Sequence, residues 1–278
     1  MTAGRSGARL AAARGVVALA LLACLVAHPA AAVEVRDVYK AETIVTGTGA
    51  AERQRGFRET LAEVMVKASG DATLLGSERL ERVTDRAAEF VAAYEQEDRM
   101  KGMPTHDEQG TRDRPFFLRV TFDKAKIDAA LHTLGLDPWP ADRPTVAVWL
   151  GIRDAVLSYV LTETGERGYG QREALRLASR RRGVPIVLPT PEAVERAALT
   201  YNTIEEGDPA RLSAAAAGEG ADAVLFGTLV YDGEGHWIID WSFDRAGALR
   251  HWRQEHVTFD VALRGGIEGA ARALAGLP

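Results

Sequence analysis

Four arginines lie close together near the end of one predicted helix, and such a cluster could bind an anion. The helix spans residues 169–182, and the four are Arg176, Arg180, Arg181 and Arg182. Guanidinium groups suit the phosphates of an anionic lipid or of a phosphorylated envelope polymer. Cations at a helix C-terminus also complement the helix dipole while they stay in solvent, and for a run of charge we favour this second interpretation. The four arginines remain a candidate interaction surface.

A histidine and two aspartates share one face of a predicted strand. His236, Asp240 and Asp244 alternate with apolar residues, so their side chains point the same way. An acid beside a histidine could take part in proton transfer. Solvated strand positions explain the same pattern and are the favoured interpretation. We therefore add His236 and Asp240 to the candidate interaction surface and predict no catalytic residue.

The sequence lacks the compact motifs that mark common metal, nucleotide and hydrolase sites. It contains no H-E-x-x-H, no G-x-S-x-G and no G-x-x-x-x-G-K-[ST]. Gly47-x-Gly49 precedes a predicted helix, but Glu52 occupies the third glycine position of a dinucleotide fingerprint, which favours a simple turn. His251 and His256 face opposite sides of a predicted strand and cannot share a metal there. We predict no metal and no cofactor, while a serine triad that meets only in the folded chain stays open.

The elements that must position these residues are clearest around a predicted hairpin. Residues 221–231 are apolar on both faces, as expected of a strand buried on both sides. Gly227 within this strand indicates a close backbone approach or a bulge. A turn follows at residues 232–235, where two glycines can adopt positive φ. The return strand alternates, and its inward-facing residues are Trp237, Ile239, Trp241 and Phe243.

The first half of the chain is predicted to have the element order β-α-α-β-α. The ranges are 33–45, 50–69, 77–97, 116–122 and 123–134. Gly70 is expected to end the first helix, and Ser77 and Asp123 to cap the next two. Residues 99–114 are polar, with glycines and a proline, and are expected to form a long exposed loop.

The second half is predicted to have the order β-β-α-β-α-α-β-β-β-α around a mixed sheet. Its ranges before the hairpin are 145–152, 155–163, 169–182, 185–188, a short helix opened by Thr190-Pro191, and 210–217. After the hairpin, residues 249–259 form an edge strand and 261–277 a closing helix. Leu175, Leu177 and Ala178 are the expected apolar face of the helix 169–182.

Three prolines between residues 138 and 144 favour a stiff linker between two domains. The predicted division is a signal peptide at 1–32, an N-terminal α+β domain at 33–137, the linker at 138–144 and a C-terminal α/β domain at 145–278. The fold class is therefore α/β (α+β), with two small domains and a C-terminal β-hairpin and helix.

The first 32 residues resemble a secretory signal. Three arginines precede an apolar run at residues 15–26, and Ala30-Ala31-Ala32 offers a cleavage site. This pattern predicts a periplasmic protein. Leu21-Leu22-Ala23-Cys24 is close to a lipoprotein processing box, so an anchor at Cys24 is the alternative, and it is the case in which we expect membrane contact. The 278-residue chain has a net charge of −5, which gives no reason to expect nucleic-acid binding.

Several segments together resemble an uncharacterised family of exported proteobacterial proteins, a domain of unknown function. They are residues 58–71 (RETLAEVMVKASGD), 116–135, Pro144 to Leu150, Arg182-Gly183-x-Pro185 and Gly220-Ala221-Asp222-Ala223-Val224-Leu225-x-Gly227. That family carries no assigned catalytic residue. The second half also resembles small α/β domains of envelope proteins, namely the Tol-Pal propeller protein, the outer-membrane activators of penicillin-binding proteins and the curli secretion lipoprotein. The first half resembles the N-terminal domain of a flagellar T-ring protein.

These resemblances imply a binding or assembly module, although function does not follow from fold. The leading hypothesis is a non-enzymatic periplasmic protein whose partner is an envelope protein or the peptidoglycan-associated machinery. One alternative is a hydrolase of an envelope polymer or lipid, with a dispersed site near His236 and Asp240. Another is a small-ligand binder between the domains, near Trp139 and Trp149.

Overall fold

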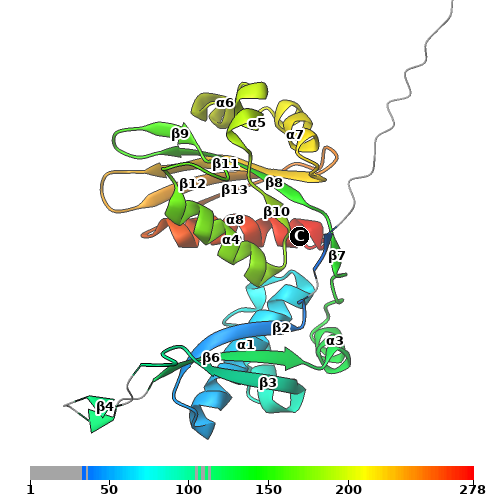
Figure 1. Ribbon diagram of the computed structural model, residues 1–278. Coiled ribbons are helices and arrows are strands. Elements are labelled where there is room, and N and C mark those ends of the chain that lie inside the picture. Colours follow the sequence, from blue (N-terminus) through cyan, green and yellow to red (C-terminus); the bar gives the residue numbers. More distant parts are fainter. Residues whose placement is uncertain (1–32, 36, 104–105, 108–109, 112–113) are drawn as a thin grey trace, which may run out of the picture.

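The computed structural model describes residues 33–35, 37–103, 106–107, 110–111 and 114–278. The predicted signal peptide and Cys24 lie outside these residues. Two main sheets dominate the described chain, the smaller with one hydrophobic cluster and the larger with a cluster on each face (Figure 1). We call residues 40–133 the first unit and residues 146–274 the second unit. The mixed α+β class predicted from the sequence is confirmed.

The first unit is a three-stranded antiparallel sheet with helices on one face. Its strands follow the order β2-β6-β3, with β2 at Lys40–Thr46, β6 at Pro115–Phe122 and β3 at Val91–Asp98. Its helices are α1 (Ala50–Ser69), α2 (Glu78–Thr84) and α3 (Lys124–Thr133), with 3-10 turns η1 (Ala72–Leu74) and η2 (Ala87–Phe90). Leu61, Val64 and Met65 of α1 pack against the inner face of the sheet. The opposite face of the sheet carries Glu42, Arg119 and Glu97, which form exposed ion pairs.

One predicted helix of the first unit is wrong. Residues 77–97 do not form one helix: α2 ends at Thr84 and Val91–Asp98 is strand β3. The order is therefore β-α-α-β-β-α among the larger elements. The apolar residues from Leu80 to Tyr94 fit a helical period, but the backbone of β3 pairs with β6 along its length. Within residues 99–114 the described part includes β4 (His106–Asp107) and β5 (Gly110–Thr111), which pair with each other.

The second unit is a mixed six-stranded sheet in the order β10-β8-β11-β12-β13, with β9 also pairing with β8. Its strands are β8 (Val146–Arg153), β9 (Ser158–Val160), β10 (Ile186–Val187), β11 (Ala223–Tyr231), β12 (Trp237–Asp244) and β13 (Arg250–His256). Strands β10, β8 and β11 are parallel, and β12 and β13 continue antiparallel. The predicted hairpin and the predicted edge strand are therefore both present.

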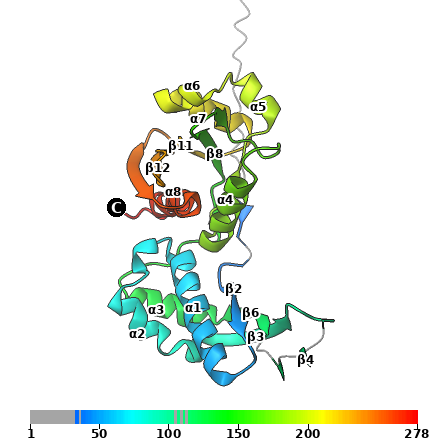
Figure 2. The same ribbon diagram turned by 90° about the vertical axis from the view of Figure 1, so that its left-hand side faces the viewer.

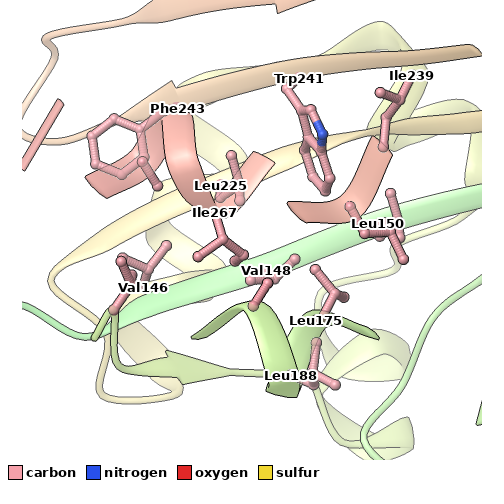
Figure 3. Close-up of a cluster of buried hydrophobic side chains, with 14 of the residues drawn as sticks. Val146, Val148, Leu150, Leu175, Leu188, Leu225, Ile239, Trp241, Phe243 and Ile267 are labelled. Atoms are coloured by element: carbon pink, nitrogen blue, oxygen red, sulfur yellow. The ribbon is translucent and has the colours of Figure 1, made fainter. Parts of the chain in front are cut away.

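Helices cover this sheet on both faces (Figures 1 and 2). They are α4 (Tyr169–Arg182) and α8 (Phe259–Leu274) on one face, and α5 (Pro191–Arg196), α6 (Tyr201–Glu206) and α7 (Pro209–Gly218) on the other. The short α6 was not predicted. Leu150, Leu175, Trp241 and Ile267 meet in the cluster beneath α4 and α8 (Figure 3). Trp149 lies in the opposite cluster, where its indole nitrogen donates to Leu212 O at 3.1 Å.

The hairpin confirms the close approach expected at Gly227. A Cβ built there would lie 2.0 Å from Asp240 O, and the pairing of β11 with β12 runs without a register shift, so no bulge is present. One expectation about this hairpin is wrong. Asp244 is 6% exposed and accepts a hydrogen bond from Ser213 of α7 at 2.8 Å, because α7 covers the end of the face that was expected to meet water.

Candidate functional site

A buried arginine lies where the two units meet. Arg143 is fully buried and belongs to β7 (Asp142–Arg143), which pairs with β1 (Val33–Glu34). Its guanidinium donates to Lys67 O of α1 at 2.9 Å, and to Arg182 O and Gly183 O at the end of α4 at 3.2 and 2.8 Å. The C-termini of two helices, which both carry partial negative charge, therefore accept hydrogen bonds from the same guanidinium cation.

The segment between the units is packed rather than solvated. The Arg143 guanidinium stacks 3.6 Å from the Trp139 ring, and Trp139 N donates to Ala68 O at 2.6 Å. Burial lowers the pKa of Arg143 to about 10, so the group stays charged at neutral pH. Arg272 of α8 also pairs with the buried Asp71 of the first unit. The division into two domains joined by a linker at 138–144 stays a prediction, but Trp139 and Arg143 within that segment are buried.

An open cleft of about 710 Å³ lies beside this junction, between β2 and α4. Its first wall contains Lys40, Ala41 and Glu42 of β2 with Glu63 and Lys67 of α1. Its second wall contains Leu177, Arg180 and Arg181 of α4, followed by Gly183, Val184 and Pro185. In Figure 1, α4 lies above β2, and the residues that line the cleft come from distant parts of the sequence.

Two titratable side chains of α1, one turn apart, lie in this cleft. Lys67 is 5% exposed, and its ammonium donates to Lys40 O at 2.7 Å and to Asp37 O at 3.3 Å. Burial lowers the pKa of the Lys67 ammonium and raises the pKa of the Glu63 carboxyl, the latter against the attraction of Lys67 and Arg181. Opposed shifts of this kind in a cleft mark a candidate functional site, although a structural ion pair produces them too.

Side chains of α1 also cover the outer edge of β2. Besides Lys67 at Lys40 O, Arg55 donates to Ile44 O at 3.4 Å, and Thr46 N donates to Glu52 at 3.3 Å. An unpaired strand edge is a template for pairing with other chains, and charged side chains are one way to cover it. Lys67 therefore has a structural role at the edge of the sheet as well as a place in the cleft.

The four arginines of the predicted cluster have different partners in the structure. Arg182 is 6% exposed and donates to Glu268 of α8 at 2.5 and 3.0 Å. Arg176 pairs with Glu173 in its own helix at 3.0 Å. Arg181 lies 3.6 Å from Glu63 across the cleft, and Arg180 is exposed with no ion pair among the described residues. Arg180 and Arg181 thus line the cleft, whereas Arg176 and Arg182 are absent from its lining.

His236 and Asp240 do not join this cluster. Both belong to the hairpin, on the sheet face opposite α4, and the structure does not bring them together either. His236 Nδ1 lies 3.2 Å from Asp232, whereas Asp240 pairs with Arg253 at 3.0 Å.

Asp240 instead has a different histidine nearby. Ser242 Oγ lies 3.1 Å from His251 Nδ1, and His251 Nε2 lies 3.9 Å from Asp240. This serine-histidine-aspartate row lies on an exposed strand face, and β12, which carries Ser242 and Asp240, is paired on both sides with β11 and β13. Side chains of a solvated ladder give the same contacts.

Trp139 and Trp149 were expected to lie together near a ligand, but they pack in different parts of the structure. Trp139 stacks on Arg143 between the units, but Trp149 is buried under α7 and does not face the other unit. Among the described residues, no three His, Cys, Asp or Glu side chains come close enough to hold a metal ion. No helix within the described ranges combines the length and the apolar character that a membrane span requires.

The sequence did not indicate Arg143, Glu63 or Lys67 as site residues. The i, i+4 spacing of Glu63 and Lys67 on the apolar side of a predicted helix was the available signal, because charged residues are rarely buried without a reason. Arg143 stood in a proline-rich segment that was expected to be a stiff linker between two domains. Its only signal was its position between Pro140 and Pro144, a few residues after Trp139.

Comparisons with known proteins give a family match and likenesses to solved structures. Residues 32–140 match the family described as Domain of unknown function (DUF8605), which confirms the resemblance of the first half to an uncharacterised family. No curated protein matches the sequence. The C-terminal domain of LpoB from Salmonella enterica is 13% identical, with a TM-score of 0.28, over 41% of this chain and 82% of that domain. A superposition that loose carries neither fold nor function to this chain.

Proposed function

We propose that the protein is an exported, non-enzymatic binding module of the cell envelope that holds a ligand or partner in the cleft between β2 and α4. The observation that carries the proposal is the convergence of both units on this cleft, with the partly buried Glu63 of α1 facing Arg181 of α4 at 3.6 Å. Ligand sites are concave and commonly lie between domains. The signal-like residues 1–32 support export, with an anchor at Cys24 as the alternative.

The proposal is tested by photo-crosslinking in cells. Leu177 projects from α4 into the cleft and is 43% exposed, so a photoreactive residue placed there should be captured by whatever occupies the cleft. Val156, in the turn before β9, is 84% exposed and lies outside the cleft, which makes it the matched control. We expect an envelope component crosslinked from position 177 and not from 156.

Equal labelling from both positions, or none from either, would contradict the cleft as a binding site. The same sample should be used to determine the mature N-terminus. A start at Val33 supports a free periplasmic protein, and a lipidated Cys24 supports the anchored alternative. A full-length chain that stays in the cytoplasm would contradict the proposed export.

A second function has one specific observation behind it, the Ser242, His251 and Asp240 row. If the row hydrolyses esters, Ser242→Ala and His251→Ala should each remove nearly all turnover of a short p-nitrophenyl ester. We expect no such loss, because the histidine of the row is exposed to solvent and β12, which carries the serine, is paired with strands on both sides, so its own N–H groups are not available to stabilise an oxyanion. His236→Ala is the control, since His236 contacts Asp232 instead. Saturable hydrolysis that disappears only in the first two variants would favour the hydrolase.

A further inference from the structure

The cleft has a small apolar surface around one exposed leucine of α4. Leu177 was expected to belong to the core face of α4, but it is 43% exposed and lines the cleft. Val35 and Pro185, both half-buried, line the same depression, and the buried Ala41 and Val184 lie behind them. An exposed apolar side chain with apolar neighbours in a concavity marks a place where an apolar group can be taken out of water.

The charges around this apolar surface leave an excess of positive charge on the α4 wall. Lys40 pairs with Asp37 at 2.9 Å, and Arg119 pairs with Glu42 at 2.6 Å, so these side chains largely neutralise one another. Arg180 has no ion pair among the described residues. The wall is therefore basic in a chain whose net charge is −5.

Glu63 removes only part of this excess. Its carboxylate is 3.6 Å from Arg181, longer than a direct hydrogen bond, and it forms no ion pair with Arg180 among the described residues. A ligand anion that reaches both Arg180 and Arg181 would gain charge-assisted hydrogen bonds from two guanidinium groups.

Lys67 does not supply a second, deeper anion site. Its ammonium already donates to two backbone carbonyls, Lys40 O and Asp37 O, and it lies at the covered edge of β2. The free positive charge is thus confined to Arg180 and Arg181 at one side, with the apolar residues beside them. The cleft therefore has one position suited to an anionic group and, beside it, another suited to an apolar chain.

From this juxtaposition we propose that the cleft binds a small amphiphile, a molecule with one anionic head group on Arg180 and Arg181 and an apolar chain along Leu177 and Pro185. The inference rests on the proposed function, because it names the ligand class of the same cleft. A volume of about 710 Å³ falls within the roughly 300–1,000 Å³ typical of ligand pockets.

The test measures binding of three short probes to the purified protein lacking residues 1–32, by isothermal titration calorimetry. Octyl phosphate carries both parts of the ligand, octyl glucoside carries only the apolar chain, and inorganic phosphate carries only the head group. We expect octyl phosphate to bind at least about tenfold more tightly than either of the others, because only it uses both contacts. Octanoate, compared with octyl phosphate, shows whether a carboxylate or a phosphate head group is preferred, and tight binding of either one supports the proposal.

Variants assign the binding to the cleft. Arg180→Ala with Arg181→Ala should weaken octyl phosphate binding by about tenfold or more, since charge-assisted hydrogen bonds are lost. Arg167→Ala with Arg245→Ala removes the same charge from exposed positions outside the cleft and should change binding less than about twofold, the size expected of distant surface charge. Leu177→Ser should weaken octyl phosphate and leave the small affinity for inorganic phosphate unchanged.

Three results would overturn the proposal that the cleft binds an amphiphile. The first two are that octyl glucoside, or inorganic phosphate, binds as tightly as octyl phosphate. The third is that the two double variants weaken octyl phosphate binding equally. None of them would affect crosslinking of a protein partner from position 177, so the ligand class can fail while the proposed function stands. A fourth such result would be a protein that crosslinks from position 177 equally well with and without octyl phosphate, because two ligands cannot occupy one cleft at once.

Discussion

Replacing Arg143 by methionine is expected to lower the free energy of unfolding by about 3–5 kcal/mol, the range typical of removing one partner from a buried polar cluster. The side chain is fully buried and donates to carbonyls of both units and of the segment between them, including Lys67 O, Gly183 O and Pro140 O. Methionine fills similar space but leaves these acceptors without a donor, and each buried unpaired group costs about 1–3 kcal/mol. Loss of the guanidinium stacked on Trp139 adds to the cost.

Urea denaturation followed by far-UV circular dichroism would measure this loss. Arg143→Lys keeps the charge but not the planar fork, so one ammonium cannot reach carbonyls of both helix ends, and an intermediate loss is expected. Arg245→Met changes an exposed arginine and should stay within about 0.5 kcal/mol of the parent protein. A loss below about 1 kcal/mol for Arg143→Met would show that the carbonyls find other donors and that Arg143 does not hold the units together.

Replacing Gly227 by alanine is expected to cost about 3 kcal/mol or more, at the upper end of the usual range for inserting a group into a packed interior. The added Cβ would lie 2.0 Å from Asp240 O and 3.0 Å from Trp241 Cε3. Because the nearer atom is a backbone carbonyl, it cannot move without disturbing the pairing of β11 with β12. Strand β11 lies between β8 and β12, so the disturbance reaches the centre of the larger sheet.

A thermal melt of the two proteins would show the effect as a fall of about 6–12 °C in Tm, at roughly 2–4 °C for each kcal/mol in a chain of this size. Gly218→Ala is the matched control, because Gly218 ends helix α7 and has no atom within 4 Å of a built Cβ. That variant should leave Tm unchanged or raise it slightly, since alanine restricts the unfolded chain. Equal Tm values for the two variants would mean that β12 moves away from Gly227 at little cost.

The sequence predicted those parts of the fold in which the hydrophobic pattern fits only one kind of secondary structure. Helix α1 and the β11–β12 hairpin combine a clear period with a glycine stop or turn, and both formed as expected. Strand β3 was missed because the apolar residues from Leu80 to Tyr94 also satisfy a helical period, and only pairing with β6 resolves the conflict. A local sequence pattern cannot predict the pairing of β3 with β6, because that pairing joins residues distant in the chain.

The candidate site was predictable only in part, for a related reason. The run of arginines at the end of α4 was visible in the sequence, but which of them carry a free charge depends on Glu268 and Glu63, both contributed by other helices. Arg143 was not visible, because its partners are carbonyl groups rather than acidic side chains. Carbonyls are present at every residue, so no pattern of residue types marks the place where several converge.

Arg143 also has a consequence for how the cleft meets a ligand. The residue ties the end of α1, which supplies one wall, to the end of α4, which supplies the other, and both links are made to backbone atoms. The spacing of the walls is therefore set before any ligand arrives, and little conformational entropy remains to be lost on association. Such a preorganised cleft selects by shape and charge and does not need to close, so its occupied and empty forms should share one backbone arrangement.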